Sequence, residues 1–210
     1  MLHNERKEYT REHLDIENCP NTPIELLQQW IDRAVEEKIP DATAFTLSTI
    51  DLLGWPRSRV VLLKYLDQNQ GLTFFTNYTS QKAKDIGGNR NVSLNFFWKE
   101  HERQVRILGV AEKCGDQCSD DYFYSRPKES RVGAIISNQS SCLESRADLR
   151  KKFNELNSKD ISELKRPFHW GGYNIKPHYF EFWQGGAHRL HDRVVYKKEG
   201  VSWSKLMLQP

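Results

Sequence analysis

The stretch with the most reactive side chains runs over residues 182–193 and reads Phe-Trp-Gln-Gly-Gly-Ala-His-Arg-Leu-His-Asp-Arg. Its adjacent glycines permit a tight loop. Behind them come imidazole and guanidinium groups, among them Arg189, His191 and Arg193, close to the indole of Trp183. Histidine and aspartate side chains could ligate a metal ion, but the flanking arginines would repel a dication. We therefore predict a functional loop that binds no metal.

Basic residues elsewhere stand beside turns and hydroxyl groups, which is typical of phosphate sites. Arg59 and Lys64 lie five residues apart in a predicted strand. Their side chains should point to opposite faces and could serve two different anions. Lys82 follows Thr79 and Ser80 at a predicted helix start, where free N–H groups and the helix dipole favour an anion. The alternative for Lys82 is an ordinary solvent-exposed lysine.

A third group combines a phenol, a guanidinium and a hydroxyl at steps of four residues: Tyr122, Arg126 and Ser130. In an unbroken helix they would line one side and could hold a phosphate. Pro127 disfavours helix at Arg126, so a turn is expected there and convergence depends on the fold. Ordinary helix-turn-helix polarity is the alternative.

The elements that must position these residues form successive blocks. A helix over 22–37 begins at Thr22 and Pro23 with a predicted capping box that Glu25 closes. Strands follow, with Phe45, Leu47 and Thr49 on one face. The other predicted strands are 57–66, 72–76, 91–98, 103–113, 173–184, 192–197 and 201–207, and the other predicted helices are 80–86, 119–125, 128–136 and 145–157. This order predicts an α+β fold, an antiparallel β-barrel with surrounding helices.

Length and composition set the class of protein. The 210 residues fit a single domain, predicted over 22–210, after a flexible N-terminal arm over 1–21. A net charge of +3 gives no reason to infer a nucleic-acid partner. Apolar runs such as 60–63 fall far short of the roughly 20 residues that a membrane helix needs. The charged first residues lack the apolar core of a secretory signal, so we expect a cytoplasmic protein.

Taken together, these segments resemble the pyridoxine/pyridoxamine 5'-phosphate oxidase family. The resemblance covers nearly the whole chain, and the order of the matching segments makes coincidence improbable. The matching segments are Arg6-Lys-Glu-Tyr9, Arg59-Val-Val-Leu-Leu-Lys64, Phe75-Thr-Asn77, Ser80-Gln-Lys82, Glu102-Arg-Gln-Val105, Tyr122-Phe-Tyr-Ser-Arg-Pro127, Ser137-Asn-Gln-Ser-Ser141 and 183–193.

The resemblance implies a split barrel that binds flavin mononucleotide (FMN). It places the FMN phosphate at Arg59, Lys82 and Ser140, and the flavin at backbone groups of Thr76 and its neighbours. The full set of cofactor-binding residues that it implies is Arg59, Val60, Val61, Leu62, Lys64, Phe75, Thr76, Gln81, Lys82, Gln104, Gln139, Ser140, Trp183 and Arg193.

The resemblance also implies a reaction and a partner. Pyridoxine 5'-phosphate or pyridoxamine 5'-phosphate would be oxidised to pyridoxal 5'-phosphate, with O2 reduced to H2O2, in sites at the interface of a homodimer. Arg189 and His191 would be catalytic and contact the pyridine ring. The implied substrate-binding residues are Arg6, Tyr9, Lys64, Tyr122, Arg126, Ser130, Arg189 and His191, with Arg6 and Tyr9 on a mobile arm.

Two positions depart from the family pattern, and two other functions are weighed. Gln81 stands where the family commonly has arginine, and losing that charge-assisted hydrogen bond would cost FMN binding about 1.5 to 3 kcal/mol unless another contact compensates. Ala187 replaces a residue that is often polar. The alternatives are a related flavin oxidase for another heterocycle, such as a phenazine precursor, and a non-catalytic FMN- or haem-binding module. The substrate phosphate residues discriminate against the first, and peroxide release against the second.

Overall fold

A computed structural model describes residues 8–210 of the chain. Its helices are α1 (Pro23–Glu36), α2 (Gln81–Gly88), α3 (Asp116–Ser125), α4 (Lys128–Ile136) and α5 (Arg146–Asn157), with short 3-10 turns at Ile16–Asn18, Ile161–Glu163 and Ala187–Arg189. Its strands are β1 (Ala44–Ile50), β2 (Pro56–Leu62), β3 (Tyr65–Asp67), β4 (Gly71–Asn77), β5 (Asn91–Trp98), β6 (Arg103–Lys113), β7 (Trp170–Gln184), β8 (Asp192–Glu199) and β9 (Ser202–Met207). No helix among these residues is long and apolar enough to cross a membrane.

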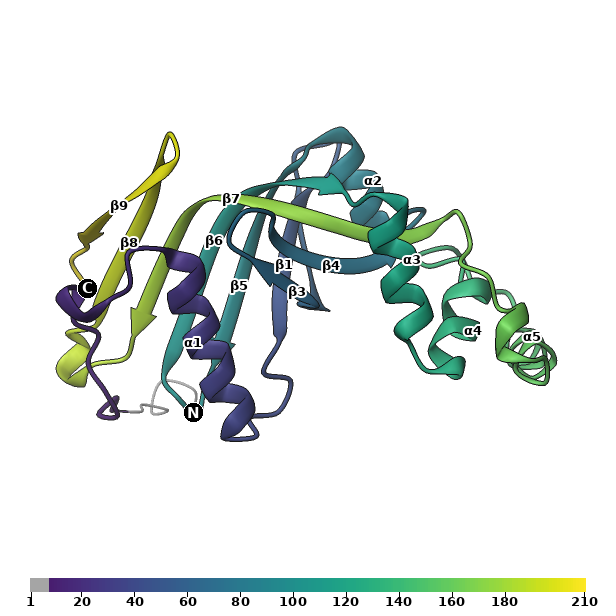
Figure 1. Ribbon diagram of the computed structural model, residues 1–210, viewed down its shortest axis with the longest axis horizontal. Coiled ribbons are helices and arrows are strands. Elements are labelled where there is room, and N and C mark those ends of the chain that lie inside the picture. The colour runs from purple at the N-terminus through teal and green to yellow at the C-terminus, as the bar shows by residue number, and fades with distance from the viewer. Residues whose placement is uncertain (1–7) are drawn as a thin grey trace.

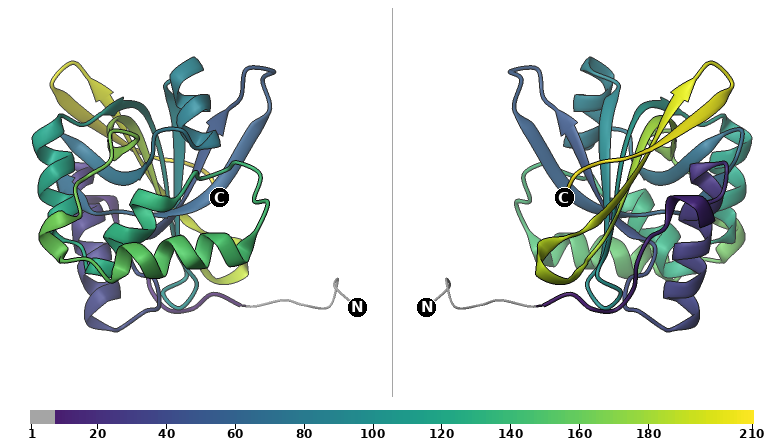
Figure 2. Two further views of the ribbon diagram at one scale, coloured as in Figure 1. Left: turned by 90° about the vertical axis from the view of Figure 1, so that its right-hand side faces the viewer. Right: turned by 90° about the vertical axis from the view of Figure 1, so that its left-hand side faces the viewer.

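One curled antiparallel sheet contains all nine described strands (Figures 1 and 2). Its order is β2-β1-β5-β6-β7-β4-β3, and β8 pairs with both β7 and β9. The long strand β7 pairs with β6 along one edge. Along its other edge it pairs first with β4 and then with β8. The sheet therefore divides at β7, and the predicted α+β split barrel with surrounding helices is confirmed.

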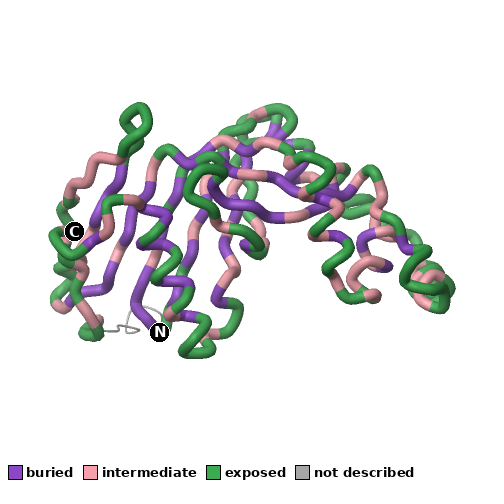
Figure 3. Tube along the Cα trace, viewed as in Figure 1, coloured by how far each residue is buried: buried purple, intermediate pink, exposed green. Residues whose placement is uncertain are grey.

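The core lies between the inner face of this sheet and α1 (Figure 3). Phe45, Leu47 and Thr49 are buried at alternate positions of β1, as their period of two predicts. On α1, Trp30 is buried with its ring edge-on to Phe182, the centroids 5.2 Å apart. The helix thus covers the half of the sheet where β7 runs beside β8.

A smaller core attaches the helices α3 and α4 to the other half of the sheet. Phe123 of α3, Ala134 of α4 and Trp170 of β7 form it, with Phe75 and Tyr122 packed against them. These helices project beyond the sheet at the end opposite β8 and β9 (Figure 1). The wall between sheet and helices is therefore aromatic.

Two local expectations are wrong. Thr22 occupies the position before α1 but makes no capping hydrogen bond through its side chain. Pro23, which has a fixed φ and no N–H to satisfy, begins the helix without it. The predicted strand over 57–66 is also interrupted, since β2 ends at Leu62 and β3 begins at Tyr65.

Residues 8–21 of the predicted arm pack against the body of the protein. Cys19 is buried in the main core, and Leu14 and Ile16 lie against it. The hydroxyl of Tyr196 donates a hydrogen bond of 2.7 Å to the carbonyl of Pro20. The flexibility of the arm stays a prediction, and its residues 1–7 lie outside the described residues.

Candidate functional site

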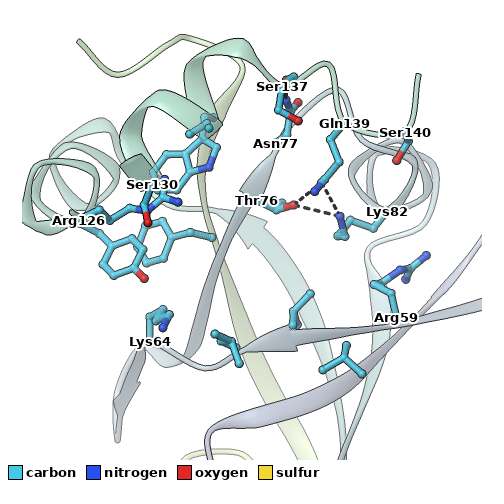
Figure 4. Close-up of a pocket in the computed structure, with 18 of the residues that line it drawn as sticks. Arg59, Lys64, Thr76, Asn77, Lys82, Arg126, Ser130, Ser137, Gln139 and Ser140 are labelled. Atoms are coloured by element: carbon cyan, nitrogen blue, oxygen red, sulfur yellow. Dashed lines mark hydrogen bonds between the residues drawn. The ribbon is translucent and has the colours of Figure 1, made fainter. Parts of the chain in front are cut away.

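A cavity of about 940 Å³ lies between the sheet, α2 and the helices α3 and α4. Figure 4 shows its polar side chains gathered at two separated ends. Most of the residues predicted to bind cofactor or substrate line it: Arg59, Val60, Val61, Leu62, Lys64, Phe75, Thr76, Gln81, Lys82, Tyr122, Arg126, Ser130, Gln139 and Ser140.

At one end, Lys82 brings a buried ammonium group into the cavity. It belongs to the first turn of α2 and is 8% exposed. Its Nζ lies 2.8 Å from Oε1 of Gln139, 3.1 Å from Oγ1 of Thr76 and 3.3 Å from Oγ of Ser80. These partners are neutral, so they do not balance its charge. Burial, followed by the positive charge of Arg59, lowers the pKa of Lys82 to about 8.

The guanidinium of Arg59 reaches the same end from β2 (Figure 4). Its Nη1 donates 2.7 Å to Oγ1 of Thr49, and its Nη2 lies 3.5 Å from Oδ2 of Asp85. Asp85 also accepts from Nε2 of Gln81 at 2.8 Å. The backbone N–H of Gln81 donates to Oγ of Ser140 at 3.1 Å. Arg59, Lys82 and Ser140 therefore form a compact set of donors for an anion.

At the other end, Arg126 and Lys64 supply a second pair of cations. The guanidinium of Arg126 lies 4.8 Å from the ring centroid of Trp170. Its Nη1 is buried and has no hydrogen-bond partner among the described residues. Burial lowers the pKa of Arg126, because the charged form loses hydration there. A buried donor without a partner is costly, and an anion in this part of the cavity would satisfy it.

Aromatic rings line the end of the cavity that holds Arg126 and Lys64 (Figure 4). Phe75 stacks on Tyr122 with centroids 4.0 Å apart and on Trp170 with centroids 5.6 Å apart. Lys64 lies 5.9 Å from the centroid of Tyr122. Such a wall suits a flat heterocyclic ligand.

The break between β2 and β3 brings Arg59 and Lys64 into one cavity. The sequence predicted an unbroken strand with the two side chains on opposite faces. Leu63 is instead buried beyond the end of β2, and the N–H of Lys64 bonds to the carbonyl of Thr73 on β4. Both cations therefore line the same cavity, at its two ends.

Tyr122, Arg126 and Ser130 also converge, although not on one helix. The helix α3 ends at Ser125, and Arg126 has an extended backbone before Pro127. The helix α4 then begins at Lys128 and carries Ser130 into the cavity wall. The turn that Pro127 predicted is confirmed.

A second group of predicted residues lies outside this cavity, around the loop between β7 and β8. The ring of His191 lies 4.8 Å from that of Trp183, and Tyr9 packs edge-on against both. The N–H of Gly186 donates to Nδ1 of His191 at 3.1 Å. In the neutral imidazole the proton is therefore on Nε2.

The arginines of this loop differ in their surroundings. Arg193 is bound to Glu181 through Nε at 3.0 Å and Nη2 at 2.8 Å. Arg189 has a φ of 64°, and His188 before it a φ of 55°. Two successive residues in the left-handed region are strained, and such strain is concentrated at functional sites. Arg6 lies outside the described residues.

Gln104 completes the second group from the neighbouring strand. It pairs with Trp183 in the register of β6 and β7, and its side chain donates to Asn95 at 2.7 Å. Trp170 of the cavity and Trp183 lie near opposite ends of β7. At about 3.3 Å per residue, they are separated by roughly 40 Å along the strand. Within one chain the two groups do not share a site.

Comparison with known proteins decides the family. A family model described as pyridoxamine 5'-phosphate oxidase matches residues 31–160, and one described as the pyridoxine 5'-phosphate oxidase C-terminal dimerisation region matches residues 170–210. The chain belongs to the pyridoxamine 5'-phosphate oxidase family. The pyridoxine/pyridoxamine 5'-phosphate oxidase of Polynucleobacter asymbioticus is 45% identical over 98% of this chain and 97% of its own length. That of Actinobacillus pleuropneumoniae serotype 5b is 46% identical over 100% of this chain and 99% of its own.

Two solved structures are similar to this fold. PhzG from Burkholderia lata, in complex with tetrahydrophenazine-1-carboxylic acid, matches with a TM-score of 0.88 and 29% identity, over 96% of this chain and 100% of its own. A pyridoxamine 5'-phosphate oxidase-related, FMN binding protein of Nostoc punctiforme matches with a TM-score of 0.76 at 13% identity, over 91% and 100%. The second likeness concerns the fold alone.

Six further residues line the cavity that were not predicted to bind cofactor or substrate: Asn77, Pro127, Gly133, Ala134, Ser137 and Trp170. Asn77 is 4% exposed, and its side-chain amide donates to the carbonyl of Ser137 at 2.7 Å. This bond ties β4 to the segment that carries Gln139 and Ser140. A buried asparagine at the end of a strand was the available signal for it, whereas nothing in the sequence marks Trp170.

Proposed function

We propose that the protein catalyses the FMN-dependent oxidation of pyridoxine 5'-phosphate and pyridoxamine 5'-phosphate to pyridoxal 5'-phosphate, with O2 reduced to H2O2. The observation that carries the proposal is a single cavity with two cationic ends, one of which is lined by aromatic rings. One end suits the phosphate of FMN, and the other suits the phosphate of the substrate.

The donor set at the first end fits FMN. Arg59 and Lys82 bring two positive charges to this end, and Asp85 beside Arg59 supplies one negative charge. A phosphate dianion would relieve the remaining repulsion. Ser140 adds a hydroxyl, and Thr76 and Gln139 would hold the flavin beside them. The bound flavin supplies the redox chemistry, namely hydride removal from C4' of the substrate and reduction of O2.

The second end fits the phosphate of the substrate. The unpartnered Nη1 of Arg126 would donate to it, with Lys64 as a second cation and Tyr122 and Ser130 as hydroxyl donors. A substrate whose phosphate is held at this end would direct its pyridine ring toward the other end, where we propose that the flavin binds. The protein's contribution is then position and charge rather than covalent chemistry.

We infer that each complete site needs two copies of the chain. Trp183, Arg189, His191 and Arg193 lie far from the cavity of their own chain, and all fall within the matched dimerisation region. In a homodimer related by two-fold symmetry, the loop of one subunit can cover the cavity of the other. Arg189 would then contact the substrate ring, and Nε2–H of His191 could donate to a ring substituent.

A phenazine-type substrate is the second candidate, because the PhzG structure is similar over its whole length. The compound bound there carries a carboxylic acid and, by its name, no phosphate. Lys64, Tyr122, Arg126 and Ser130 gather more donors than one carboxylate requires, which supports a phosphate ester for this chain.

The absorption spectrum of the purified protein under anaerobic conditions tests the proposal. Addition of pyridoxamine 5'-phosphate should bleach the flavin bands, and readmission of air should restore them and release peroxide. Pyridoxamine without its phosphate is the matched control and should bleach them far more slowly. Bleaching by tetrahydrophenazine-1-carboxylic acid but not by the phosphate ester would favour the second candidate. A colourless protein that neither binds FMN nor turns over would end the proposal.

A further inference from the structure

The arm segment, residues 8–21, is fastened to the body by carboxylates. The backbone N–H groups of Thr10 and Arg11 donate to Oε2 of Glu102 at 3.0 and 3.2 Å. The N–H of Leu14 donates to Oδ2 of Asp192 at 2.9 Å. Charged acceptors make these bonds stronger than neutral ones. The course of the arm is therefore specified by polar contacts on both sides of residue 12.

Glu12 is a carboxylate of the arm segment that forms ion pairs with two arginines of the body. Its Oε1 lies 2.6 Å from Nη2 of Arg33 on α1, and its Oε2 lies 2.6 Å from Nη2 of Arg103 on β6. Hydrogen bonding to Arg33 and the charges of both arginines keep the pKa of Glu12 below its usual range. Glu12 therefore stays ionised at neutral pH and joins the arm to two separate elements.

The arginine on β6 is held rigidly. Nε of Arg103 donates to Oε1 of Gln184 at 2.9 Å, and its guanidinium lies 4.4 Å from the ring centroid of Trp30. The residue is 7% exposed. Gln184 is the last residue of β7 and directly precedes the loop of the second group. Glu12 is thus anchored to the base of that loop.

The other end of the arm segment lies on the loop itself. Tyr9 packs against Trp183 and His191, and a Cβ on Gly185 would come within 2.7 Å of its ring. Only glycine leaves room for this contact. Oε1 of Glu8 accepts from the N–H of His188 at 2.6 Å. The arm therefore touches the strained loop at two points.

We propose that Glu12 is a positioning residue for the substrate-binding loop. By clasping Arg33 and Arg103 it fixes the arm so that Glu8 and Tyr9 hold the loop that carries Arg189 and His191. The inference rests on the proposed function, because it assigns that loop to the substrate. Glu12 does not line the cavity, so it acts through the arm on the loop and leaves the phosphate site of FMN unchanged.

Two substitutions and a control test this. Glu12→Ala removes the clasp, and Glu12→Gln keeps the shape but removes the charge. Glu17→Ala removes the same charge from an exposed position of the same arm. We expect Glu12→Ala to lower kcat/KM for pyridoxamine 5'-phosphate by about tenfold, the loss of one charged hydrogen bond. Glu12→Gln should lie between, while the FMN affinity of both variants and the kcat/KM of Glu17→Ala should stay within about twofold of wild type.

Amide hydrogen exchange at Thr10 and Arg11, whose N–H groups bond to Glu102, reports the arm without any catalysis. These amides should exchange about tenfold faster in Glu12→Ala than in wild type, and at the wild-type rate in Glu17→Ala. An unchanged exchange rate would show that Glu12 does not hold the arm. Faster exchange with an unchanged kcat/KM would show that the arm does not serve the substrate. If wild type failed to oxidise the ester, the proposed function would fall, while the exchange rates would still decide whether Glu12 holds the arm.

Discussion

Lys82 and Arg59 bring two positive charges to the same end of the cavity, where burial and then the neighbouring guanidinium lower the pKa of Lys82 to about 8. A bound phosphate favours the protonated lysine and would raise this pKa again. Below pH 8 the free protein already carries the proton, so affinity for FMN should be constant there. Above pH 8 the proton must be taken up on binding, and the dissociation constant should rise by up to about tenfold per pH unit.

Quenching of flavin fluorescence between pH 6.5 and 9.5 measures this dependence. Riboflavin lacks the phosphate, so its weaker binding should not follow the titration of Lys82. Lys82→Arg keeps the charge over the whole range and should flatten the FMN curve. A wild-type curve that stays flat to pH 9.5 would show that Lys82 does not meet the phosphate.

Arg189→Ala should lower turnover by about a hundredfold while FMN content stays near that of wild type, because loss of substrate orientation costs rate rather than cofactor affinity. Arg59→Ala is the matched contrast and should empty the flavin site instead. Flavin content by absorbance and peroxide release together separate the two outcomes. Equal loss of flavin and turnover in Arg189→Ala would refute its assignment to the substrate.

Gln81→Arg should tighten FMN binding. The side-chain amide of Gln81 carries no charge, and its Nε2 donates to Oδ1 of Asp85. An arginine there would add a charge-assisted bond and lower the dissociation constant by about tenfold. Gln81→Ala is the control and should change affinity little. The gain should be absent for riboflavin, and an equal gain for both ligands would place the new side chain away from the phosphate.

The sequence predicted most elements of the fold, because alternation in the strands and apolar spacing in the helices are local signals. Phe45 and Leu47 point inward as their spacing indicates. The interruption at Leu63 was missed because the apolar run through 60–63 continues the strand pattern. The break depends on a hydrogen bond from the backbone N–H of Lys64 to the carbonyl of Thr73. Register with a distant strand is not encoded in a local window.

The site was only partly predictable for a similar reason. The types and spacing of Arg59, Lys82 and Arg126 indicated anions, and the structure places all three in one cavity. The spacing could not show that His191 lies at the far end of β7, because that separation follows from the length and pairing of the strand. The cavity residues and the loop residues all match motifs of the family, but they lie at two separate places within one chain.

This separation leads to a complementation experiment. Arg126→Ala damages the cavity group and Arg189→Ala the loop group, so each homodimer should be nearly inactive. If each site combines the cavity of one subunit with the loop of the other, a mixed dimer has one intact site and one doubly damaged site. Random assembly makes half of the dimers mixed, so co-expression in equal amounts should restore about a quarter of wild-type activity.

The control is a mixture of Arg126→Ala with Lys64→Ala, both in the cavity group. Every site in such dimers carries one damaged cavity, so activity should not exceed that of the variants alone. Tandem affinity tags isolate the mixed dimers, and peroxide release measures their activity. Mixed Arg126→Ala and Arg189→Ala dimers that stay inactive would mean that the loop does not cross to the other subunit, because only that crossing puts two undamaged groups in one site.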